Sequence, residues 1–205
     1  MIAVFDRPPI SIDDFLAWYP ETPGQRYELR RGTIIEMPKP KGKHSEIAGF
    51  IAKVLNQAID RSQRPAFIPK ECILKISEDT GYEPDVTVVS RPSLSDEPRW
   101  ESASVLERGE SALLAVEVVS TNWRDDYALK MVDYEGMGVG EYWIVDYLGL
   151  GGRRYIGNPK QPTLTVCSLV DGEYELQQFR GCDPIFSPTF PDLGLTVHQV
   201  FNPGQ

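Results

Sequence analysis

The chain has 205 residues, of which 41% are hydrophobic and 25% are charged, and these fractions are typical of a globular protein. Its 21 basic and 30 acidic residues give a net charge of -9, which excludes a protein that coats nucleic acid through its overall charge. No apolar run reaches the roughly 18 residues of a membrane helix, and the N-terminus lacks the pattern of a signal peptide. The three cysteines have neither zinc-site nor disulfide-framework spacing, so we expect a cytoplasmic location.

The first third of the chain predicts a short helix, a hairpin and a long helix. Ser11 is followed by two acids and an apolar run, which is typical of a capped helix start. Strand-like runs at 26–31 and 33–37 flank Gly32 and predict a hairpin. Over residues 44–61, apolar side chains recur at the spacing of one helix face, which is the strongest helix pattern in the chain.

The middle of the chain predicts several strands. Residues 78–81 have the composition of a turn, and residues 90–111 are rich in Ser, Glu, Arg and Pro, which predicts a surface excursion. The run 113–119 is apolar on both faces, as expected of a central strand that is covered on each side. The other strand-like runs here are 66–69, 71–77 and 85–89.

The last third predicts a helix over about 124–137 and a buried strand at 141–146. Strand-like runs at 163–169 and 174–179 flank Asp171-Gly172, which predicts an antiparallel C-terminal extension.

Two acids lie among residues that are expected to be buried. Glu117 is the single polar residue of the run 113–119, and Asp85 opens the strand that continues to Val89. An unpaired buried carboxylate is costly and needs a partner, usually a cation. A structural ion pair explains Glu117 alone, and a turn or edge carboxylate explains Asp85 alone. If both acids instead shared a metal and a phosphate with Lys130, all three charges would be satisfied together.

Lys130 lies four residues after Asp126 and four before Tyr134, so the three side chains share one face of the predicted helix. A surface ion pair between Asp126 and Lys130 is the simpler explanation of this spacing.

The order of these motifs resembles the PD-(D/E)XK nuclease superfamily, and more closely its Uma-type restriction endonuclease family. The resemblance runs from about Ile12 to Phe201. It implies an α/β (α+β) restriction-endonuclease-like fold, with a mixed central sheet flanked by helices, in one domain over residues 1–205 whose core spans about 25–147. The motifs are Tyr27-Glu28-Leu29 with Gly32, His44, Pro84-Asp85, Glu117-Val118-Val119-Ser120, Asp126 with Lys130 and Tyr134, and residues 138–145.

The resemblance implies a metal-dependent endonuclease that hydrolyses phosphodiester bonds of DNA. Asp85, Glu117 and the backbone carbonyl of Val118 would bind Mg²⁺ or Mn²⁺, since hard cations prefer oxygen ligands. Superfamily members usually have a lysine two residues after the second acid, where this chain has Val119. In the Uma-type branch the lysine comes from the following helix, which makes Lys130 the candidate. The alternative is an inactive nuclease-fold module that binds nucleic acid or protein, and a purely structural protein is a third class.

Two further candidates for the site are Glu28 and His44. Glu28 would bind metal or hold a ligand water, or it would be a cross-strand partner of an arginine. His44 would donate to a phosphate, or it would be a solvated residue of the first helical turn. The candidate DNA contact is the basic stretch of Lys39, Lys41 and Lys43. A homodimer is expected by analogy, because two sites cut two strands most simply.

Overall fold

The structure is a computed structural model that describes residues 9–20 and 25–204. Six strands form a mixed sheet in the order β11-β10-β9-β8-β6-β3, in which β8 and β9 are the parallel pair. The strands are β3 (Ala66–Phe67), β6 (Val86–Ser90), β8 (Ala112–Val118), β9 (Glu141–Asp146), β10 (Thr163–Val170) and β11 (Glu173–Phe179). The predicted mixed sheet with an antiparallel C-terminal extension is therefore confirmed.

A second mixed sheet has the order β2-β1-β5-β4-β7. The predicted hairpin forms one end of it, with Leu29 opposite Ile34 in the register. Its strands are β1 (Arg26–Arg30), β2 (Thr33–Met37), β4 (Ile73–Ser77), β5 (Thr80–Tyr82) and β7 (Val105–Leu106).

Two sequence-based expectations in this second sheet are wrong. Thr80 and Gly81 belong to strand β5 rather than to a turn, because Gly81 pairs with both Leu29 and Lys75 and so lies between two strands. The predicted surface excursion contains the buried strand β7, whose pairing with β4 fixes it to the sheet. The rest of that excursion holds the short helices η1 (Pro92–Asp96), α3 (Trp100–Ala103) and η2 (Gly109–Ser111).

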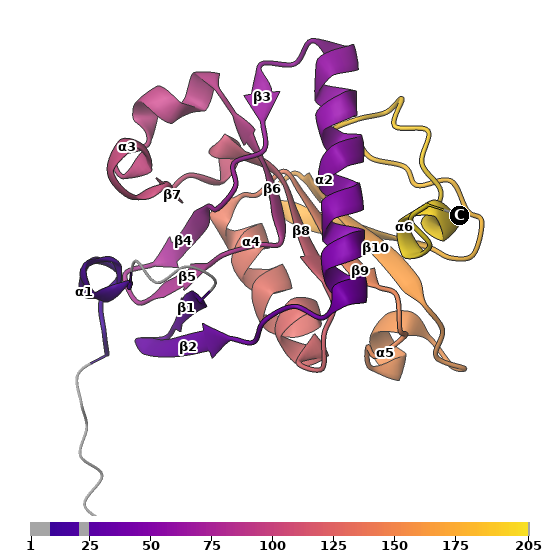
Figure 1. Ribbon diagram of the computed structural model, residues 1–205, viewed down its shortest axis with the longest axis horizontal. Helices are drawn as coiled ribbons and strands as arrows, with labels where there is room; N and C mark the ends of the chain where they lie inside the picture. The colour runs from indigo at the N-terminus through magenta and orange to yellow at the C-terminus, as the bar shows by residue number, and fades with distance from the viewer. Residues whose placement is uncertain (1–8, 21–24, 205) are drawn as a thin grey trace, which may run out of the picture.

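Helices cover both faces of the six-stranded sheet. On one face, α2 (Gly42–Ser62) packs against β6 and β8 together with α6 (Val197–Phe201), and Figure 1 shows α2 crossing in front of the strands. The π-helical segment η3 (Asp125–Lys130) and α4 (Met131–Met137) lie on the other face. They pack against it with buried side chains that include Tyr134. The predicted helix over about 124–137 is confirmed in extent, but its first turns are π-helical.

Strand β8 is buried on both faces, as predicted. Leu114, Val116 and Val118 pack in the core beneath α2, whereas Ala115 packs in the core beneath α4. Because side chains alternate along a strand, Glu117 points toward α4.

The short helix α1 (Ile12–Trp18) packs Ile12 and Phe15 against the second sheet, and the hydroxyl of Ser11 accepts a hydrogen bond from the Asp14 N–H at 3.1 Å. This confirms the predicted cap. Another short helix, α5 (Arg153–Ile156), follows β9. In the part of the chain that the structure describes, no helix combines the length and the apolar character needed to cross a membrane.

Candidate active site

A cleft of about 220 Å³ opens where the parallel strands β8 and β9 end. One side is formed by the end of β2, the following loop and the first turn of α2, and the other by the residues after β8, segment η3 and the residues after β9. The charged and histidine side chains that line it are Arg26, Arg30, Lys39, Lys41, His44, Glu83, Asp85, Glu117, Asp125, Asp126 and Lys130.

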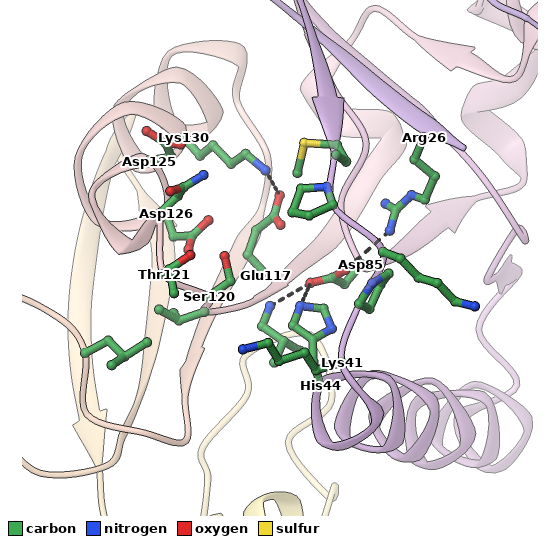
Figure 2. A pocket seen from close by; sticks show the side chains of 18 of the residues that line it. Arg26, Lys41, His44, Asp85, Glu117, Ser120, Thr121, Asp125, Asp126 and Lys130 are labelled. Carbon is green, nitrogen blue, oxygen red and sulfur yellow. Dashed lines mark hydrogen bonds and ion pairs between the residues drawn. The ribbon is translucent and has the colours of Figure 1, made fainter. Parts of the chain in front are cut away.

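Asp85 is held in place by groups from three separate segments. Its Oδ2 accepts a hydrogen bond from the Val118 N–H at 2.8 Å and lies 3.3 Å from Nε2 of His44 (Figure 2). Its Oδ1 lies 3.6 Å from Nη1 of Arg26. Burial opposes ionisation of Asp85, but the contacts with His44, Val118 and Arg26 outweigh it, so the pKa of this carboxyl lies below its ordinary value. Asp85 is therefore a fixed negative charge at the cleft.

Glu117 shares a buried lysine with a second acid. The Nζ of Lys130 lies 2.8 Å from Oε1 of Glu117 and 2.8 Å from Oε1 of Glu28, and the Tyr134 hydroxyl donates to the same oxygen of Glu117 at 2.9 Å. Burial raises the pKa of Glu117 to about 7, because the attraction of Lys130 only partly offsets desolvation and the repulsion from Asp85 and Glu28. Burial also disfavours the charge on Lys130, but its acidic neighbours outweigh that effect and raise the pKa of its ammonium.

Glu28 connects this lysine to the hairpin. Its Oε2 lies 2.8 Å from Nη2 of Arg30, and Nη1 of Arg30 lies 2.5 Å from Oδ2 of Asp125. Burial opposes ionisation of Glu28, but Lys130 and Arg30 outweigh it and lower the pKa of this carboxyl. One alternative expected for Glu28 is a cross-strand ion pair with an arginine. Glu28 does pair with an arginine, but Arg30 is on the same strand, β1, and not on a neighbouring strand.

The structure contradicts two of the simpler interpretations. Lys130 is 2% exposed, and its ion-pair partners are Glu28 and Glu117, so it does not form a surface ion pair with Asp126. His44 is not a solvated residue, because its side chain is 13% exposed and contacts Asp85.

Asp126 adds a further acid to the cleft. Its side chain is buried and lines the cleft, and neither carboxylate oxygen has a hydrogen-bond donor among residues 9–20 and 25–204. Burial raises the pKa of Asp126 well above its ordinary value, and Glu117 adds repulsion. The motifs that resemble the nuclease family include Asp126, but the sequence assigns it no role in the site. Buried acids therefore outnumber buried bases here, and an added cation would favour the ionised form of Asp126.

Arg26 is a site residue that the sequence does not reveal. Its Nε lies 2.7 Å from Oε1 of Glu83, and its Nη2 donates to the Glu83 carbonyl at 2.8 Å, while Nη1 faces Asp85. These partners lie more than fifty residues away along the chain, where no periodic pattern links them. Arg26 fixes the residues on either side of Pro84.

The donor set fits a hard divalent cation. Oε2 of Glu117 accepts no hydrogen bond from any described residue, and Oδ1 of Asp85 has the guanidinium of Arg26 at 3.6 Å but accepts no hydrogen bond from the described residues, so each acid has one oxygen that can take a ligand. In the described ranges, no group of three or more His, Cys, Asp or Glu side chains is arranged to hold a metal. This is compatible with Mg²⁺, which usually takes one or two carboxylates and completes its octahedron with water and substrate phosphate.

The fold and the cleft place the chain in the restriction-endonuclease-like class. Its fold matches a crystal structure described as "a putative nuclease belonging to DUF820 from Anabaena variabilis ATCC 29413", with a TM-score of 0.67 over 94% of this chain and 98% of that chain at 24% identity. A sequence model of the family described as "Putative restriction endonuclease" (Uma2) matches residues 12–198, and the chain belongs to this family. The expected membership is confirmed. A search of curated proteins finds no match.

Proposed function

We propose that the chain is a metal-dependent endonuclease that hydrolyses phosphodiester bonds of DNA. The observation that carries this proposal is the convergence of Asp85, Glu117 and Lys130, from three separate segments, on one cleft with an excess of buried acid. Membership of the restriction endonuclease family supports a nuclease function.

We propose that Asp85, Glu117 and the carbonyl oxygen of Val118 hold Mg²⁺ or Mn²⁺. The oxygens of the two acids that accept no hydrogen bond, and the nearby carboxyl of Asp126, which a cation would favour in its ionised form, support this assignment. The bound metal would lower the pKa of a coordinated water and neutralise charge on the scissile phosphate.

The remaining residues position these groups. An ammonium has three protons, and Lys130 uses two of them on Glu28 and Glu117, which leaves one to orient a water or a phosphate oxygen. His44 fixes Asp85 and lies in the first turn of α2, where free N–H groups attract phosphate. Glu28 holds Lys130 in place and is a positioning residue.

Two exposed lysines support a local DNA contact. Lys39 and Lys41 line the cleft, whereas Lys43 pairs with Glu46 at 3.1 Å and does not line it. The homodimer stays a prediction. We also propose a cytoplasmic location, which is supported by the free thiols of all three cysteines.

An inactive nuclease-fold module is the second candidate function. The observation that favours it is the pairing of Lys130 with both Glu28 and Glu117, since such an ion-pair cluster would also be stable without any chemistry.

The proposal is tested by plasmid cleavage with Mg²⁺ or Mn²⁺. We expect the wild type to cleave and Asp85→Asn, Glu117→Gln and Lys130→Met to lose activity. Glu175→Gln, which removes an exposed acid on β11, is the matched control and should cleave like the wild type. Equal cleavage by all five proteins would show a contaminating nuclease and a wrong site.

Metal binding separates the two candidate functions. We expect millimolar Mg²⁺ or Mn²⁺ to raise the melting temperature of the wild type and of Glu175→Gln, but not of Asp85→Asn, because a ligand stabilises only the state that binds it. A wild type that binds metal but cleaves neither double-stranded DNA, single-stranded DNA nor RNA would favour the inactive module.

A further inference from the structure

A second group of cations lies beside the cleft, around helix α5. Four side chains contribute to it, and all four residues are exposed: Arg124, Arg153, Arg154 and Lys160. The chain as a whole carries a net charge of -9, so a local surplus of positive charge here stands out against the rest of the surface.

Aromatic rings hold three of these cations. The guanidinium of Arg124 lies 4.7 Å from the ring centre of Trp123, and Nζ of Lys160 lies 5.7 Å from it. Arg154 lies 4.9 Å from the ring centre of Tyr155. A cation–π contact orients a cation but leaves its charge in place, unlike a carboxylate. The rings therefore limit the motion of these side chains without neutralising them.

The four cations also lack acidic partners among the residues that the structure describes. None of them is within ion-pair distance of a carboxylate in residues 9–20 and 25–204, whereas Arg26, Arg30 and Lys130 in the cleft all are. Cations that are held in place but not neutralised are suited to an external polyanion.

The rings rest on a rigid loop. Tyr155 stacks on buried Tyr127 with ring centres 5.1 Å apart, and a Cβ at Gly152 would lie only 2.9 Å from the ring of Trp123. The carboxylate of Asp146 accepts hydrogen bonds from the N–H groups of Leu150 and Gly151, at 2.9 and 2.8 Å. Close packing and these hydrogen bonds fix the surface before any ligand arrives.

This surface continues directly from the cleft. Leu148 and Leu150 line the cleft just before α5, and Asn122 lines it just before Trp123. Figure 1 shows α5 below the lower end of α2. In Figure 2, Thr121 lies on the Glu117 side of the cleft and Lys41 on the Asp85 side, and Thr121 is two residues before Trp123.

We propose that Trp123, Arg124, Arg153, Arg154, Tyr155 and Lys160, the α5 surface, bind the phosphate backbone of a nucleic-acid strand that passes through the cleft. The inference rests on the proposed function, because the strand is the one whose scissile phosphate would lie at Asp85 and Glu117. Lys39 and Lys41 would contact the strand on the other side of the cleft, and the α5 surface would fix its direction.

The test is binding of a fluorescein-labelled oligonucleotide, single-stranded or duplex, measured by anisotropy in EDTA over a series of salt concentrations. The α5 variant carries Arg124→Gln, Arg153→Gln, Arg154→Gln and Lys160→Gln. Each phosphate contact contributes about 0.7 to the slope of log K against log salt on a single strand and about 0.9 on a duplex. Loss of all four contacts should therefore lower the slope by about 2.8 on a single strand and about 3.6 on a duplex, and weaken binding at every salt concentration.

The matched control removes the same charge elsewhere. It carries Lys53→Gln, Arg61→Gln, Lys70→Gln and Arg108→Gln, which are exposed positions outside the cleft lining. We expect the control to bind close to the wild type, because backbone contacts require cations at the strand and not only a given net charge. Equal melting temperatures of the two variants would show that folding is not the cause of any difference.

Several outcomes would overturn the inference. These are equal salt slopes for the α5 variant and the wild type, a wild type that binds no oligonucleotide, and displacement of the oligonucleotide as readily by polyglutamate as by unlabelled DNA. If the wild type cleaves DNA and the α5 variant binds the oligonucleotide like the wild type, the inference fails but the proposed function stands. If the α5 variant loses binding as expected but the wild type never cleaves, the inference about the α5 surface stands and the catalytic proposal is refuted.

Discussion

Replacing Lys130 by methionine removes the ammonium from between Glu117 and Glu28 while keeping most of the buried stem. Among the described residues, Glu28 keeps Arg30 as a partner, but Glu117 keeps only the Tyr134 hydroxyl. Breaking a buried pair in this way typically costs about 3–5 kcal/mol. Glu117 already takes up a proton near pH 7 beside Lys130, because its pKa is about 7, so the cost lies at the lower end of this range. We therefore expect Lys130→Met to lose about 3 kcal/mol.

Equilibrium unfolding in urea at pH 7 with EDTA measures this loss, and Lys53→Met on the exposed face of α2 is the control. The sign of the pH dependence follows from Glu117, whose pKa is about 7 beside Lys130 and rises further when Lys130 is removed. Below pH 7 Glu117 is protonated in both proteins, so the difference between variant and wild type should stay constant toward pH 4.5 and grow as the pH rises above 7. A second substitution, Glu117→Gln, should recover most of the stability lost at pH 7.

A loss below about 1 kcal/mol at pH 7 would refute the inference that Lys130 balances buried charge, given the 3–5 kcal/mol usual for such pairs. No recovery in the double variant would refute the assignment of Glu117 as the acid that it balances.

Three further predictions concern stability and are all measured by urea unfolding. Gly152→Ala should destabilise by about 1–3 kcal/mol, because its Cβ would lie 2.9 Å from the Trp123 ring, and an unchanged midpoint would show that the ring moves freely. Gly49→Ala should stabilise by about 1 kcal/mol, because the position is inside α2 with nothing within 4 Å, and any loss would contradict this. Tyr134→Phe should lose about 1–3 kcal/mol by removing a donor to buried Glu117, and a neutral result would show that water or Lys130 replaces that hydrogen bond.

The sequence predicts the parts of the fold that depend on local pattern. The apolar face of α2 and the two-sided burial of β8 follow from periodicity, and the Ser11 cap follows from residue type. The position of Glu117 toward α4 follows from the alternation of β8.

Pairing between distant segments could not be predicted in this way. Thr80 and Gly81 have turn composition, but strands on both sides make them part of a sheet, so tertiary context overrides local preference. Arg26 reaches Asp85 across more than fifty residues, and the cations near α5 come from two segments separated by β9. In each case the contact depends on the path of the chain rather than on spacing.

The spacing of Asp126 and Lys130 misled for a different reason. An i, i+4 pair usually indicates a surface ion pair on an α-helix. Here the segment is π-helical and lies against the sheet, so Lys130 reaches the acids of two strands instead.

The π-helical segment also constrains the number of residues between Glu117 and Lys130. A π turn holds an extra residue relative to an α-helix, and such turns are often found at functional sites. With this turn, Asp125 at the start of the segment reaches Arg30, and Lys130 at its end reaches Glu117. Deleting one residue between them would favour a regular helix but would rotate one of the two away from its partner. The interval of thirteen residues from Glu117 to Lys130 should therefore tolerate substitution far better than insertion or deletion.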